Sequence, residues 1–249
     1  MIRVDHEDGV AVVRLEHGKV NALDVELLRA ATATLRELAS APAIVLTGRG
    51  SAFCAGVDLR RVLDGGPAYA ADLVDAISEA VLALFDHPRP VVAAINGHAI
   101  AGGCVLAAAC DLRLMSGGSI GVTEVLVGVH FPTAALEVVR HACGAAAEEL
   151  VLSGRLLDAA EARRCGLVHE VVAPEELLGE AVRRAKALAR VPAAVYASTK
   201  ERLRRPTRER IARDREADDA RVSEAWQDPQ TVVTMRAFLE RVTGARAAC

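Results

Sequence analysis

The order of apolar and polar positions predicts strands that alternate with amphipathic helices through the first half of the chain. Apolar runs at 10–15, 43–47 and 91–95 indicate buried strands. Between these runs, apolar residues recur at helical spacing in two segments, first at Leu28, Ala31, Leu35 and Leu38, then at Leu73, Ile77, Val81 and Leu84. Asp24 stands where it can cap the first of these helices. The alternation favours an α/β fold with a largely parallel sheet.

An apolar run at 99–110 follows the third predicted strand and contains a Gly-Gly pair. The run is too short to span a bilayer, so it suits a buried helix. Gly102 and Gly103 are poor helix formers, and at a helix start they indicate a turn or a close approach of the backbone to a ligand. The first amides of a helix have no internal acceptor and lie at its positive end. The pattern therefore predicts half of an oxyanion hole, or else a core helix with small residues for close packing.

After Pro132 the pattern becomes mostly helical. Segment 111–115 predicts a strand directly after the apolar run, and beyond Pro132 only 167–172 predicts another. A further helix is expected to start at Pro174, because proline is favoured at the first helical position.

Charges of both signs are dense at 200–221, which favours a solvated helix surface, with a patch that attracts phosphate as the alternative. No repeat and no low-complexity linker divides the chain. We expect a core domain at 1–190 and a helical C-terminal region at 191–249.

Composition narrows the classes of function. The formal net charge of −3 gives no argument for nucleic acid or an anionic membrane as a partner. With 52% hydrophobic and 25% charged residues, the 249-residue chain is typical of a folded globular protein. Residues 1–15 carry charges where an export signal needs an apolar core, and the six cysteines include no CxxC pair. We therefore expect reduced thiols and a cytoplasmic location.

Two short patterns suggest other chemistry. Gly48-Arg-Gly50 follows a predicted strand like the start of a dinucleotide-binding fingerprint, yet Phe53 occupies the third glycine position and no helix opens there.

The second pattern, at 117–121, matches a nucleophile elbow centred on Ser119, with Asp158 and His169 following in the order of a hydrolase. An elbow needs an immediate helix, whereas 122–127 is a β-branched run without a cap, which favours a plain turn.

Three segments together resemble the crotonase (enoyl-CoA hydratase/isomerase) superfamily. They are TGRGSAFCAGVDL at 47–59, NGHAIAGG at 96–103 and CDLR at 110–113, and Asn21-Ala-Leu agrees with the family's first signature. The resemblance implies an α/β fold of the ClpP/crotonase type, a superhelix of ββα units whose helical C-terminal region serves trimer formation.

The same resemblance implies an acyl-CoA thioester as substrate, with coenzyme A as part of that substrate and neither a separate cofactor nor a metal. The thioester oxygen is then held by two backbone amides, which the motifs place at Val57 and Gly102. The substrate-binding residues implied are Ala55, Val57, Asp58, Leu59, Arg60 and Gly102. For Arg60, a place near the CoA phosphates and a solvated side chain are both open.

The acidic positions distinguish the reactions of the family. Hydratases of this family use two glutamates, and here the first position is Val105 while the second motif places a carboxylate at Glu124. Members that shift a double bond from the 3,4 to the 2,3 position keep only the second. Dienoyl isomerases add an aspartate where this chain has Pro132. His98 and His130 are expected to be pocket walls or structural hydrogen-bonding groups rather than bases.

We therefore expect a Δ3,Δ2-enoyl-CoA isomerase that uses Glu124, Val57 and Gly102. The alternatives are an enoyl-CoA hydratase-type lyase and a protein that binds acyl-CoA without turnover. Cys54 and Cys104 are expected to pack as apolar groups, and Asp58 and Asp111 to cap or pair. Apolar residues of the C-terminal third, Trp226, Phe238 and Leu239, favour a homotrimer or a dimer of trimers.

Overall fold

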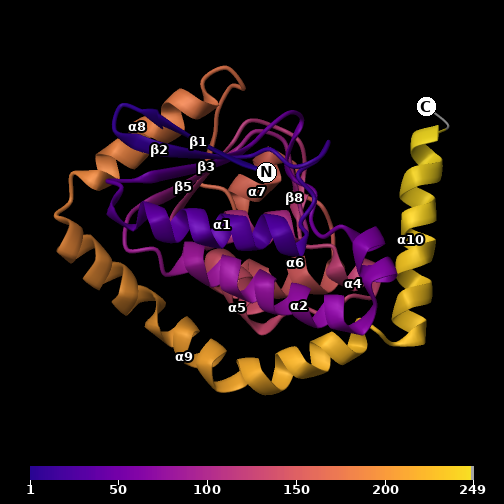
Figure 1. The fold of residues 1–249 in the computed structure, drawn as a ribbon. Helices are drawn as coiled ribbons and strands as arrows, with labels where there is room; N and C mark the ends of the chain where they lie inside the picture. The colour runs from indigo at the N-terminus through magenta and orange to yellow at the C-terminus, as the bar shows by residue number, and fades with distance from the viewer. Residues whose placement is uncertain (248–249) are drawn as a thin grey trace.

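The computed structural model describes residues 1–247 and contains two sheets wrapped by helices (Figure 1). The larger sheet has strand order β1-β2-β3-β5-β7-β9, and only the β1–β2 hairpin is antiparallel. Its strands are β1 (Ile2–Glu7), β2 (Val10–Leu15), β3 (Ile44–Gly48), β5 (Val91–Ile95), β7 (Leu112–Met115) and β9 (Glu170–Val171). A parallel sheet of this kind is usually covered by helices on both faces.

The smaller sheet is parallel and consists of β4 (Ala52–Cys54), β6 (His98–Ile100) and β8 (Ile120–Gly121). Each of its strands directly follows a strand of the larger sheet and leads toward a helix, so β3-β4-α2, β5-β6-α3 and β7-β8-α4 repeat one ββα unit. The hairpin β1-β2 with α1 precedes them as a fourth unit. The ββα repeat expected from the sequence resemblance is confirmed.

Helices cover both faces of the larger sheet. They are α1 (Val25–Glu37), α2 (Leu59–Phe85), α3 (Gly102–Ala109), α4 (Glu124–Val127), α5 (Thr133–Cys143), α6 (Ala147–Ser153), α7 (Ala159–Arg164), α8 (Leu177–Ala189), α9 (Ala193–Ala225) and α10 (Pro229–Ala247), with short 3₁₀ turns at Leu38–Ser40 and Gly144–Ala146. One face packs against α8, while the other packs against α1, α2 and α3 (Figure 1). Strands buried on both faces explain why they appear as continuous apolar runs.

Most predicted elements are present, with corrections at their ends. The strands predicted at 10–15 and 91–95 coincide with β2 and β5, and the Asp24 side chain caps α1 by accepting from the Leu27 N–H at 2.8 Å. The helix predicted to start at Pro174 begins at Leu177, because Pro174 lies in a turn before it. The sequence pattern did not predict the mainly polar strand β1.

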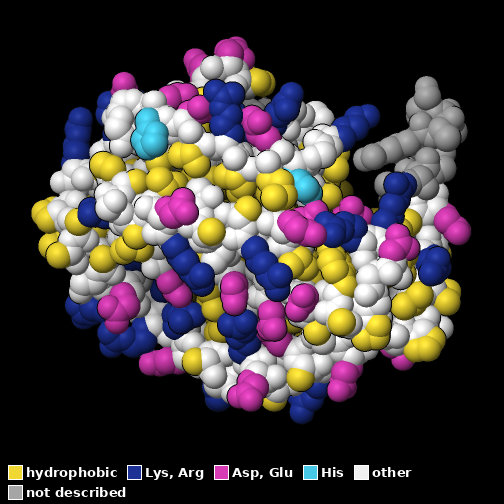
Figure 2. Space-filling view, viewed as in Figure 1, with side chains coloured by type: hydrophobic (Ala, Val, Ile, Leu, Met, Phe, Trp, Pro, Cys, Tyr) yellow, Lys and Arg dark blue, Asp and Glu magenta, His cyan; other side chains and the backbone are white. Residues whose placement is uncertain are grey.

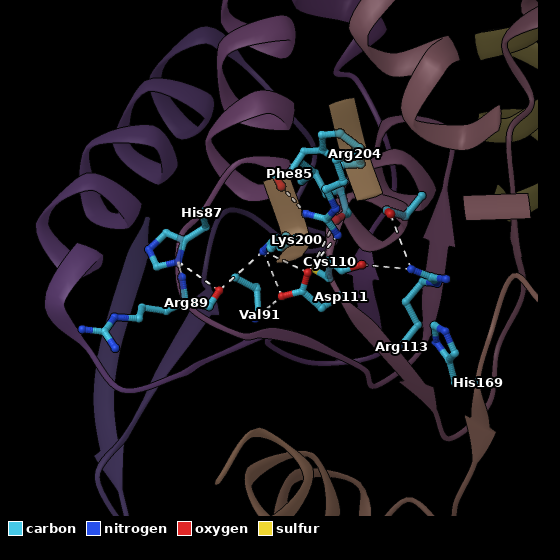
Figure 3. A network of polar contacts seen from close by, with 12 residues as sticks. Phe85, His87, Arg89, Val91, Cys110, Asp111, Arg113, His169, Lys200 and Arg204 are labelled. Atoms are coloured by element: carbon cyan, nitrogen blue, oxygen red, sulfur yellow. Dashed lines mark hydrogen bonds and ion pairs between the residues drawn. The ribbon is translucent and has the colours of Figure 1, made fainter. Parts of the chain in front are cut away.

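The solvated helix surface predicted at 200–221 is present over most of the segment, but several of its charged residues are buried. Lys200, Arg204 and Asp219 on α9 are buried, and Figure 3 shows Asp111 between the first two. The Asp111 carboxylate lies 2.9 Å from Lys200 Nζ and 2.8 Å from Arg204 Nη2. Arg204 also donates to the Phe85 carbonyl and stacks on the Phe85 ring at 4.2 Å. These contacts dock α9 along α2 and α5.

The two alternative motifs serve structural roles. After Gly48 the chain continues into β4 rather than a helix, and a Cβ on Gly48 would lie 2.4 Å from the Ala52 carbonyl, so glycine is needed for this close approach. Of the elbow residues, Asp158 caps α7 in a capping box, and His169 Nδ1 accepts from the Arg113 N–H. The β-branched run after Ser119 includes the short helix α4, which sequence reasoning did not expect.

Candidate active site

Three parallel strands of the smaller sheet end around one cavity. Residues that follow β4 include Val57, residues that follow β6 include Gly102, and Glu124 comes three residues after β8. Carboxyl ends of parallel strands are a common location for ligand sites, because the loops there converge. The cavity has a volume of about 430 Å³ and includes all three of these residues in its lining.

Leu23 fixes the orientation of the Val57 peptide. The Leu23 N–H donates to the Gly56 carbonyl at 2.8 Å, and the Asp58 N–H donates to the Leu23 carbonyl at 2.9 Å. Because both bonds flank Val57 on one side of an extended backbone, the Val57 N–H points to the other side. This N–H has no acceptor within residues 1–247.

Asn21 braces the same loop from the first signature of the sequence. Its backbone is in the left-handed region at φ 53, and its Nδ2 donates to the carbonyls of Ala52 and Phe53 at 3.0 and 3.2 Å. The side chain therefore connects the N-terminal loop to β4, directly before the residues that carry the Val57 amide.

Gly102 is the first residue of α3, so its N–H belongs to the unsatisfied helix amides. It finds no acceptor in the part of the chain that the structure describes. Ala101 before it has φ 51, which is strained for alanine and sets the direction of the next peptide. A Cβ on Gly56 would lie 2.9 Å from the Ala101 Cβ and 3.6 Å from the Gly102 nitrogen. The two candidate amides therefore sit on adjacent segments that only glycine allows to approach.

Glu124 faces the same cavity as the first residue of α4. Its Oε2 is buried and has no hydrogen-bond partner among residues 1–247. Burial raises the pKa of Glu124 to about 8, against the opposing effect of the backbone amides of Glu124 and Thr123. A carboxyl group with a pKa near working pH can both accept and return a proton.

The other acidic positions give no second free carboxylate in the cavity lining. Val105 and Pro132 line the cavity where the family motifs allow acids. Asp58 also lines it, but Oδ1 accepts from the Arg60 N–H at 3.0 Å as the cap of α2. Glu137, a buried glutamate of α5, lies outside the lining and pairs with arginines of α5 and α9.

The remaining predicted substrate-binding residues also lie around this cavity. Its lining includes Ala55, Leu59 and Arg60. Arg60 is exposed, which leaves both of its predicted roles open.

Cys54 and Cys104 are buried, as expected for apolar packing groups, whereas His98 and His130 are exposed. Burial raises the pKa of the Cys54 thiol to about 12 and raises the Cys104 pKa as well, so both are poor nucleophiles. His98 Nδ1 accepts from the Ser119 N–H, and the His130 carbonyl accepts a side-chain bond, so both residues have structural contacts.

Three residues from the C-terminal third complete the cavity. Trp226, Phe238 and Leu239 belong to its lining, and α10 lies beside α2 and α4 (Figure 1). Trp226 is buried in its own chain at 2% exposure, whereas Phe238 and Leu239 are half-buried beside the cavity. Trp226 is therefore not part of a free face for a partner subunit, and the homotrimer or dimer of trimers stays a prediction. Their helical spacing alone could not reveal which surface they pack against.

Comparison with known proteins identifies this arrangement. The sequence matches the enoyl-CoA hydratase/isomerase family over residues 5–245. The chain belongs to this family. It is therefore an acyl-CoA enzyme of the crotonase superfamily.

Relatives within the family carry names of two different activities. A Thermus thermophilus protein named as an enoyl-CoA hydratase is 38% identical over 197 residues, 76% of each chain. Rat mitochondrial enoyl-CoA delta isomerase 1 is 32% identical over 226 residues, 88% of this chain and 78% of the relative. The crystal structure of human mitochondrial delta3-delta2-enoyl-CoA isomerase superposes with a TM-score of 0.93 at 28% identity, covering 98% of each chain. The crotonase fold is thus shown.

Location is not decided by these relatives. The rat relative is named as mitochondrial, so a cytoplasmic location stays a prediction for this chain. Within residues 1–247, every helix is too short or too polar to cross a membrane.

Proposed function

We propose that this enzyme is a Δ3,Δ2-enoyl-CoA isomerase in which Glu124 is the single acid-base group. One observation carries the proposal: the buried Oε2 of Glu124, which has no hydrogen-bond partner in residues 1–247, shares an apolar cavity with two free backbone amides. The apolar residues Val105 and Pro132 stand at the positions where other members of the family place further acids.

In the proposed reaction, the Glu124 carboxylate removes a proton from C2 of a 3-enoyl thioester. The electron pair of that C–H bond moves into the thioester carbonyl and forms a dienolate. The N–H groups of Val57 and Gly102 donate to the developing oxyanion, and each donor contributes about 3 kcal/mol by analogy with other oxyanion holes. The protonated Glu124 then delivers its proton to C4, where the electron pair of the former 3,4 double bond forms the new C–H bond. The enolate pair between C1 and C2 moves to form the 2,3 double bond, the oxyanion restores the thioester carbonyl, and Glu124 is again a carboxylate. No other proton donor is needed.

The raised pKa sets the pH dependence of this step. At pH 7 a carboxyl with a pKa of about 8 is ionised in only about a tenth of the free enzyme molecules. Because the ionised form is the base, kcat/KM is expected to increase with pH and to level off above about 8. A flat profile from acid to neutral pH would contradict a buried base.

The hydratase alternative is supported by the names of relatives such as the Thermus thermophilus protein. Hydration would require Glu124 to hold a water and also to supply a proton to C2. The test offers 3-hexenoyl-CoA and 2-hexenoyl-CoA to the purified enzyme side by side. Isomerisation of the first supports the proposal, and hydration of the second without isomerisation refutes it. Inactivity on both at several chain lengths would favour binding without turnover.

A homotrimer or a dimer of trimers remains our proposal for the assembly. Large apolar side chains stay exposed at several positions, among them Leu152 and Leu203, each 70% exposed. Acidic and basic side chains are intermixed on the face in Figure 2, so a single-sign field does not oppose association there. Light scattering at micromolar concentration should give at least three subunits, and a monomer would contradict this.

A further inference from the structure

Glu124 lies on a segment that has little structure of its own to hold it. Helix α4 is four residues long, and Thr123 at its N-cap makes no side-chain capping bond within the described chain. Helices this short are marginal because nucleation is costly. The chain turns at Gly128 in the left-handed conformation and reaches α5 at Thr133. The place of the carboxylate therefore depends on what holds the connecting loop 128–133.

Trp226, at the C-terminal end of α9, holds this loop at one point. Its Nε1 donates to the His130 carbonyl at 2.8 Å, and the side chain is buried at 2% exposure. The Trp226 ring and Val129 both line the cavity. Inside the loop, the Val129 N–H donates to the Glu124 carbonyl at 2.9 Å. A continuous path of bonds thus connects α9 to the Glu124 backbone.

Asp219 holds the loop at a second point, two helical turns earlier on α9. Its Oδ1 accepts from the Thr133 N–H at 2.8 Å. Pro132, the N-cap of α5, provides no side-chain capping bond in the described structure, so Asp219 supplies the missing acceptor from another helix. Asp219 is itself fixed by Ser78 Oγ of α2 at 3.0 Å.

We propose that Trp226 and Asp219 are positioning residues, which clamp loop 128–133 onto α9 and so hold Glu124 at its working place. The inference rests on the proposed function of Glu124 as the base. Neither residue exchanges a proton with the substrate. If the clamp is released, water reaches the Glu124 carboxyl group and lowers its proton affinity. The loop also moves, so Glu124 is no longer placed correctly against the substrate.

The test compares Trp226→Phe with wild type. Phenylalanine keeps an aromatic ring against the cavity and removes the Nε1 donor. Hydrogen exchange, measured by mass spectrometry on peptides that cover 122–132, should be faster in the variant. For 3-hexenoyl-CoA, kcat should fall about tenfold because a small misplacement of a base is costly, while KM stays within about twofold. The midpoint of the pH profile should shift to lower pH.

Asp219 provides the second pair of variants. Asp219→Ala removes the acceptor for the Thr133 N–H and should show the same pattern, whereas Asp219→Asn keeps an acceptor oxygen and should restore most of kcat. Ile211→Val is the matched control, because Ile211 is a buried apolar residue of α9 that takes part in none of the clamp's hydrogen bonds. It should leave exchange over 122–132, kcat and the pH midpoint unchanged.

Unchanged exchange over 122–132 in Trp226→Phe would overturn the proposal. It would also be overturned by faster exchange with wild-type kcat, or by equal effects of Trp226→Phe and Ile211→Val. If wild type isomerises no 3-enoyl-CoA, the proposed function fails, while the exchange comparison still decides whether the clamp exists.

Discussion

Replacing Glu124 by glutamine should abolish isomerisation and at the same time stabilise the protein. The native carboxyl has a pKa of about 8, whereas its ordinary value in the unfolded chain is near 4.5. As pH increases, the Glu124 carboxyl ionises at a lower pH in the unfolded chain than in the native state. The native state therefore loses stability as pH increases between these two values. The loss is absent below the lower value and reaches about 5 kcal/mol above the higher one.

Glutamine is neutral at every pH and avoids this loss. Glu124→Gln should therefore unfold with a free energy larger than that of wild type by about 1 kcal/mol near pH 5.5, about 3 near pH 7 and about 4.5 near pH 8.5. Urea titrations at these pH values, followed by fluorescence of the single tryptophan Trp226, measure the difference. Glu79→Gln, at an exposed glutamate of α2, is the matched control for the loss of one carboxylate. A gain in Glu124→Gln that is independent of pH, or a loss near pH 8.5, would refute a buried carboxyl with a raised pKa.

Four further substitutions test the amide donor, the missing acid and the docking of α9. Gly102→Pro removes the N–H at a helix position where proline is tolerated, so kcat for 3-hexenoyl-CoA should fall about a hundredfold. Gly102→Ala keeps the N–H, so its kcat should be far less affected. Val105→Glu should introduce some hydration of 2-hexenoyl-CoA, measured as formation of the 3-hydroxy product. Absence of this product would contradict the assignment of Val105 to the position of the first hydratase glutamate. Asp111→Ala leaves Lys200 and Arg204 buried without their carboxylate and should lower the free energy of unfolding in urea by about 3–5 kcal/mol. If the free energy of unfolding falls by less than about 1 kcal/mol, the ion pairs of Asp111 with Lys200 and Arg204 are exposed in solution.

Local patterns predicted the elements that are long and buried. Strands β2 and β5 are buried on both faces, so their apolar runs are visible in the sequence. Strands β4, β6 and β8 are too short for a periodic signal, and β1 alternates polar residues at a sheet edge. The smaller sheet, which arranges the candidate site, therefore could not be predicted from periodicity.

The candidate site was found through motifs, because the glycines and Glu124 stand next to short strands at fixed spacing. The side chains that surround the site could not be predicted from the sequence. Trp226 reaches the cavity from the end of α9, a helix that Asp111 anchors through Lys200 and Arg204. Contacts between residues so distant in the chain leave no local pattern, which is why Trp226 was assigned to a subunit interface.

The transfer of one proton by one buried group is the central claim, and isotopic labelling tests it most directly. The enzyme is given 3-hexenoyl-CoA that carries deuterium at C2, in ordinary water, and the 2-hexenoyl-CoA formed is examined by NMR. Because the Glu124 Oε2 is buried away from solvent, the deuterium it takes from C2 should be recovered in substantial part at C4. A product in which C4 carries only hydrogen from the solvent would contradict the account.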